Sequence, residues 1–159
     1  MNGGLVPLLL LSASIGLMLA FVATRAMIIG LIAFVGAALL ALAFPLGMSP
    51  NMLFAGLWLS MIAATILVYV PVVRWSFAAI PLCLNAGFWL GSCAALSGDS
   101  TAPALGLLPA LVAIPAKWLT RREFDIAIKV VASWLIAIAS LSLFVSLVPT
   151  PGYKPDHME

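Results

Sequence analysis

The run from Phe77 to Leu96 limits what this chain can fold into more than any other stretch. Its sequence, FAAIPLCLNAGFWLGSCAAL, has twenty residues and no charge. About 20 apolar residues form a helix long enough to cross the hydrocarbon core of a bilayer, which is ~30 Å thick. Lipid cannot hydrogen-bond peptide groups, so a spanning segment has to satisfy them within a helix or a closed barrel. The stretch therefore predicts a transmembrane helix over residues 77–96.

A small residue recurs at every fourth position of this stretch. Apolar side chains gain little in lipid by leaving the tails for one another, so helices associate by close backbone approach along such rows. We therefore predict that neighbouring helices pack against this one along a face that includes a GxxxG pair. The predicted helix-packing residues are Ala79, Gly87, Gly91 and Ala95, with Cys83 in the same row.

Composition extends the membrane assignment to nearly the whole chain. Of 159 residues, 65% are hydrophobic and only 8% are charged, whereas a soluble domain has roughly 25% charged residues. We predict an all-α polytopic integral membrane helix bundle that forms one domain over residues 1–148, followed by a polar, outward-facing tail over 149–159. About six transmembrane helices are expected, near residues 5–24, 27–44, 52–73, 77–96, 104–119 and 121–148.

The basic residues predict an orientation. Six of the seven fall at alternate turns and would lie on one side of the membrane: Arg25, Arg74, Lys117, Arg121, Arg122 and Lys129. By the positive-inside rule that side is cytoplasmic. The expected arrangement is three helical hairpins with both termini on the outer side, which is periplasmic for a bacterial inner membrane. The net charge of +2 comes from loop residues and does not indicate a nucleic-acid partner.

Asn85 is the only side-chain amide near the middle of a predicted span, and Trp89 lies one turn further along the helix. Residues four apart share a face of a helix. One interpretation is that Asn85 makes an interhelical hydrogen bond. The other is that Cys83, Asn85 and Trp89 bind a small-molecule ligand. Cys83 and Cys93 are too far apart on one helix to form a disulfide, and buried packing is the ordinary role of such thiols. A soft metal or cofactor contact at Cys83 is the alternative.

The predicted segment over 104–119 contains Pro109 and Pro115. Proline removes an intrahelical hydrogen bond and kinks a helix. The two prolines indicate either a bent packing helix or a hinge beside a cavity, as in the broken helices of some transporters.

The next turn reads Thr120-Arg121-Arg122-Glu123. Its T-x-x-E spacing is typical of a capping box and predicts that the last helix begins near Arg121. Arg121 and Arg122 are an orientation signal, or else a docking site for a cytoplasmic partner or a lipid phosphate.

The sequence lacks the common signatures of chemistry. The HExxH, GxSxG and P-loop patterns are absent. The predicted spans hold no paired carboxylates and no acid in their apolar parts, so proton-coupled transport is not expected. The single histidine, His157, lies in the tail near Asp156 and Glu159, which we read as stray polar residues. We predict no metal site, no cofactor and no enzymatic activity; an enzyme would have to use Cys83 or Cys93.

Two functional hypotheses remain. The first is a non-catalytic subunit or accessory component of a larger membrane complex of the transport type. Its partners would be the lipid bilayer and other membrane subunits or copies of itself, and replacing Gly87 or Gly91 by leucine should then release them. The alternative is a small-solute transporter or membrane-embedded substrate-capture protein that uses Cys83, Asn85 and Trp89.

Overall fold

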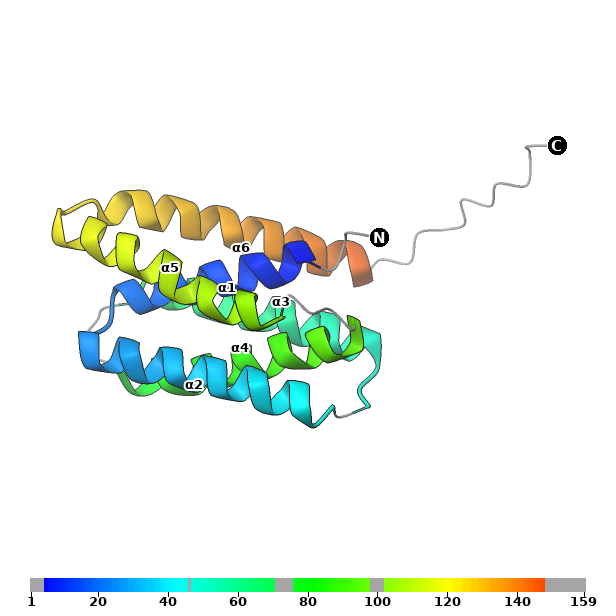
Figure 1. Cartoon of the computed structure of the whole chain (residues 1–159). Coiled ribbons are helices and arrows are strands. Elements are labelled where there is room, and N and C mark those ends of the chain that lie inside the picture. Colours follow the sequence, from blue (N-terminus) through cyan, green and yellow to red (C-terminus); the bar gives the residue numbers. More distant parts are fainter. Residues whose placement is uncertain (1–4, 46, 71–75, 98–101, 148–159) are drawn as a thin grey trace.

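The structure, a computed structural model, describes residues 5–45, 47–70, 76–97 and 102–147, and all regular structure in these ranges is helical (Figure 1). The predicted tail over 149–159 and Arg74 lie outside the described residues. The six helices are α1 (Leu5–Ala20), α2 (Thr24–Ala43), α3 (Pro50–Leu67), α4 (Ser76–Ser97), α5 (Ala102–Arg121) and α6 (Asp125–Leu147).

Four of these helices are long and apolar enough to cross a membrane, and the described part of the chain contains no strand. They lie in α2, α3, α4 and α6, over Thr24–Ala43, Pro50–Leu67, Phe77–Leu96 and Asp125–Val145. Helix α1 contributes a shorter apolar helix. The prediction of an all-helical chain with several membrane-compatible helices is therefore confirmed.

The first helix is shorter than predicted. It ends at Ala20, and the chain turns there because the N–H of Phe21 donates to the carbonyl of Met18 at 3.2 Å. Arg25 consequently lies in the first turn of α2 instead of between the helices. The start of α3 follows ordinary capping chemistry, since Ser49 Oγ accepts from the Met52 N–H at 3.4 Å.

The capping box predicted at Thr120 is wrong. Thr120 Oγ1 donates to the carbonyl of Lys117 at 2.8 Å, within α5. Glu123 has a φ of 64°, and the N–H of Phe124 donates to the carbonyl of Leu119 at 3.2 Å. A left-handed residue with this bond pattern ends a helix. The Thr120–Glu123 segment therefore ends α5, and α6 begins at Asp125 instead of Arg121.

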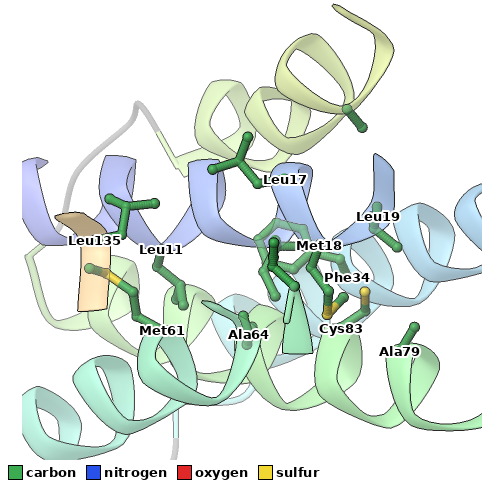
Figure 2. Close-up of a cluster of buried hydrophobic side chains, with 14 of the residues drawn as sticks. Leu11, Leu17, Met18, Leu19, Phe34, Met61, Ala64, Ala79, Cys83 and Leu135 are labelled. Atoms are coloured by element: carbon green, nitrogen blue, oxygen red, sulfur yellow. The ribbon is translucent and has the colours of Figure 1, made fainter. Parts of the chain in front are cut away.

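Helix α1, and not α4, contacts all five other helices (Figure 1). Its side chains are buried on several faces, with Leu11, Ile15 and Leu19 fully inaccessible. Figure 2 shows the cluster that results, in which α1 side chains meet Phe34 of α2 and Cys83 of α4. From Leu10 to Ala20 every residue of the 16-residue helix α1 is buried or partly buried, whereas Val6 and Leu9 near its start are exposed.

The closest helix pairs are not neighbours in sequence: α2 packs most extensively with α4, and α1 with α5. Glycines make both contacts possible. A Cβ added to Gly87 would overlap the carbonyl oxygen of Phe34, and one added to Gly91 would overlap that of Ala38. On α1, a Cβ at Gly16 would lie 2.8 Å from the carbonyl oxygen of Pro109. Backbone therefore meets backbone in each pair.

One end of the bundle gathers the described basic residues. The turns between α1 and α2 and between α5 and α6 lie together at this end (Figure 1). Lys117 Nζ donates to the carbonyl of Val22 at 2.8 Å and so joins α5 to the connection between α1 and α2. Tyr69 Oη donates to the carbonyl of Lys129 at 2.6 Å and joins the end of α3 to α6. We call this the basic end.

The α2–α4 contact gives a prediction about two glycines. Gly91→Ala should lower the free energy of unfolding by about 1–3 kcal/mol, the usual cost of overpacking, because the new methyl group meets the α2 backbone. Titration with dodecyl sulfate in mixed micelles measures this free energy.

Gly36 is the matched control, because a Cβ at this α2 position would meet nothing within 4 Å. Gly36→Ala should leave stability unchanged or raise it by up to about 1 kcal/mol through helix propensity. Equal effects of the two substitutions would contradict the close α2–α4 approach.

Candidate functional site

Helix α4 carries every residue of the predicted ligand site, but it presents them to two different neighbours. Cys83 lies in the row with Gly87 and Gly91 that faces α2, and its sulfur is 3.2 Å from the position a Cβ on Gly30 would take. Asn85 and Trp89 contact α3 instead. The structure brings Asn85 and Trp89 together and places Cys83 on another side of the helix.

A chain of hydrogen bonds links α4 to α3 at Asn85. The Trp89 indole Nε1–H donates to Asn85 Oδ1 at 3.1 Å. Asn85 Nδ2–H donates to Ser60 Oγ at 2.6 Å, and the Ser60 hydroxyl donates to the Gly56 carbonyl at 2.7 Å. Each member orients the next, so the amide is fixed against α3. We call Asn85, Trp89, Ser60 and Gly56 the amide cluster.

The absence of a side chain at Gly56 makes room for the cluster. A Cβ there would lie 2.5 Å from two ring atoms of Trp89. The indole therefore lies flat over the α3 backbone, one turn from the Ser60 hydroxyl. Ser60 itself is buried, with 3% of its surface exposed.

Asn85 remains exposed at the surface of the bundle despite these two bonds. A carboxamide has two N–H donors and two acceptor positions on oxygen. Among the described residues, Ser60 takes one donor and Trp89 occupies one acceptor position, which leaves one N–H of the exposed amide without a partner among them. Asn85 lies near the middle of the candidate span Phe77–Leu96, where lipid offers nothing to bind it.

Neither thiol forms a disulfide, and the two have different surroundings. Cys83 is fully buried in the cluster of Figure 2, among side chains of α1 and α2. Cys93 is partly exposed, and its Sγ lies 4.0 Å from the carbonyl of Leu53 on α3. No group of three or more His, Cys, Asp or Glu side chains that could hold a metal ion occurs within the described ranges.

Helix α5 runs unbroken through both predicted hinge residues. Pro109 is fully buried and its carbonyl meets α1 at Gly16, whereas Pro115 is exposed. The Pro109 contact is what a bent packing helix needs. A hinge at these prolines stays a prediction.

Arg121 and Arg122 lie at the basic end but in different surroundings. Arg121 lines a cavity together with Lys117 and Trp118. The Arg122 guanidinium stands 4.7 Å from the centre of the Trp118 ring, a distance typical of a cation–π contact. Lys117, Arg121 and the Trp118 ring thus lie around one opening, and Arg122 stacks on that ring.

Sequence reasoning missed two features of this region. By its size and spacing in the sequence, Ser60 looks like one more small packing residue. A serine in one span and an asparagine in the next can nevertheless form an interhelical hydrogen bond in lipid, and this was the available signal. Trp58 is buried, with 4% exposed, and its indole N–H has no hydrogen-bond partner among the described residues. Its ring packs edge-on against Phe54, with centroids 5.8 Å apart.

Comparison with known proteins gives no relative to extend this description. No protein-family model, no curated protein and no solved structure matches the chain.

The amide cluster predicts coupling between α4 and α3. Asn85→Ala and Ser60→Ala should be non-additive in the free energy of unfolding, with a coupling of about 0.6 kcal/mol and at most about 1.7 kcal/mol, as for interhelical bonds in membranes. A double-mutant cycle in mixed micelles measures it.

Ser133 on α6 supplies the control for this cycle, because its hydroxyl donates only within its own helix, to the carbonyl of Val130 at 2.7 Å. Ser133→Ala combined with Asn85→Ala should be additive. If Asn85→Ala and Ser60→Ala were also additive, the α3–α4 hydrogen bond would contribute nothing to the free energy of unfolding.

Proposed function

We propose that the protein is a non-catalytic integral membrane component that binds another membrane chain through its α3–α4 face. The observation that carries this proposal is the exposed amide of Asn85, near the middle of a candidate span, with one N–H that has no partner among the described residues. The partner is a different subunit or a second copy of this chain.

The cost of leaving an amide in lipid supports this assignment. An unsatisfied polar group in hydrocarbon costs several kcal/mol, roughly 2–7 by transfer measurements. A neighbouring helix can satisfy the group with a carbonyl or a side chain, and polar residues of this kind hold membrane helices together. Because Ser60 and Trp89 fix the amide, its free N–H is already oriented for a partner.

The outer face of α6 supports the same function independently. Trp134 is 70% exposed near the centre of the candidate span Asp125–Val145. Tryptophan normally lies at the headgroup level, where its N–H finds water. A mid-span indole on the surface is better accommodated against another protein chain than against lipid tails.

The position of the basic residues supports a defined orientation. We propose six spans arranged as three hairpins in a bacterial inner membrane, with the basic end cytoplasmic and both termini periplasmic. Arg25, Lys117, Arg121 and Lys129 all belong to helix ends at the basic end, as the positive-inside rule requires.

The alternative, a solute-capture pocket formed by Cys83, Asn85 and Trp89, receives less support. Cys83 contacts α2 while the other two contact α3. The Trp89 N–H and the Asn85 carbonyl, which such a pocket would offer to a solute, bind each other.

Gly87 and Gly91 also serve the internal α2–α4 contact. Their replacement would therefore disturb the fold and would not report on a partner.

Photocrosslinking in intact membranes tests the proposal. A benzoylphenylalanine at Leu84, which is 46% exposed and precedes Asn85, should crosslink to a protein chain. The same probe at Leu40, which is 64% exposed and lies on α2, a helix that contributes no residue to the amide cluster, is the matched control and should react mainly with lipid.

Asn85→Leu in the Leu84 probe background should lower the crosslinked fraction by roughly threefold to twentyfold, since an interhelical bond of this kind is worth about 0.6–1.7 kcal/mol. Stability in mixed micelles confirms that the variant is folded. Protein crosslinks at Leu40 as strong as those at Leu84, or crosslinks indifferent to Asn85→Leu, would overturn the proposed partner face.

A further inference from the structure

A cavity of about 270 Å³ opens at the basic end between α2 and α5. Both polar and apolar side chains line it: Thr24, Met27, Ile114, Lys117, Trp118 and Arg121. The polar groups come from the helix ends, and the apolar ones lie one turn deeper in the bundle. The opening therefore has a charged rim over an apolar floor.

A second cavity, of about 400 Å³, continues along the same two helices. The described residues that line it are all apolar, and they include Leu31 and Gly36 of α2 and Ala110 of α5. Leu31 lies four residues beyond Met27, and Ala110 lies four residues before Ile114. The two cavities are thus one helical turn apart on both helices. We call the combined feature the α2–α5 groove.

The groove is long enough to hold a lipid chain over a full leaflet. From Thr24 to Leu39 the α2 axis advances about 22 Å at ~1.5 Å per residue. Half of a bilayer's hydrocarbon core is about 15 Å. Gly36 keeps the deeper part open, because no atom lies within 4 Å of the position where its Cβ would be.

The rim of the groove is positive. Lys117 donates one of its three ammonium hydrogens to the Val22 carbonyl at 2.8 Å, which fixes the charge at the opening and leaves two donors. Arg121 lines the same opening, and none of the described residues that line it is acidic. Arg122 stacks on Trp118 beside it.

We propose that the α2–α5 groove binds an anionic phospholipid. The phosphate contacts Lys117 and Arg121, and one acyl chain follows the apolar floor past Gly36. The positive charge of the rim favours an anionic headgroup. The charged rim lies at the helix ends and the apolar floor lies deeper, as the headgroup and the acyl chain of a phospholipid do in a leaflet. This site lies on other helices than the partner face around Asn85, so the two proposals stand or fall separately.

Native mass spectrometry of the purified, delipidated full chain tests the site. Dioleoylphosphatidylglycerol should be retained as a single tight adduct in preference to dioleoylphosphatidylcholine at equal concentration. Arg121→Gln should reduce this preference by roughly fivefold, the usual effect of one cation near a lipid surface. Gly36→Phe should remove the tight adduct of both lipids, because the ring fills the apolar floor.

Two control variants match these changes. Arg25→Gln removes an exposed cation at the same end that does not line the opening, and Leu40→Phe places the same ring on an exposed part of α2 outside the groove. Both should bind lipid as the parent chain does. Equal retention of the two lipids, or full retention by Gly36→Phe, would overturn the proposal. Displacement of the lipid by millimolar inorganic phosphate would also overturn it, since free phosphate would then be the true occupant.

Discussion

The fold depends on the direct approach of backbones between α2 and α4. In lipid the hydrophobic effect does not drive helices together, so van der Waals contact over close-packed backbones has to do so. Gly87 and Gly91 provide that contact, because any side chain there would overlap carbonyl groups of α2. Gly16 does the same between α1 and α5 at Pro109. These two pairs set the frame into which α3 and α6 fit.

The same frame decides what the polar residues can do. Once α2 covers the Gly87 face of α4, the opposite side is left to meet α3, and Asn85 bonds there to Ser60. The thiol of Cys83 is enclosed with the core and has no route to a ligand at Asn85. The exposed groups include the Asn85 amide, the Trp134 indole on α6 and the cations at the basic end. Each of these features suits recognition by a helix or a lipid more than chemistry on a solute.

Much of the fold was predictable because lipid leaves a chain few choices. Uncharged runs of spanning length have to be helices, and the GxxxG pair of Gly87 and Gly91 indicates close packing. The partners of each helix were not predictable, since the helices carry apolar residues on most of their faces and nothing in composition marks α1 as central. The end of α5 was misread because T-x-x-E suits a helix start, while Glu123 in fact adopts the left-handed conformation that ends one. The separation of Cys83 from Asn85 was available from the sequence, because residues two apart do not face each other on a helix.

We propose that this chain works by binding other membrane chains and not by holding a solute. Native mass spectrometry of the protein, extracted gently from its own membranes, tests that claim most directly. We predict a complex whose mass exceeds the 16.7 kDa of one chain by at least one further polypeptide. A monomer that carries only a small-molecule adduct would contradict it.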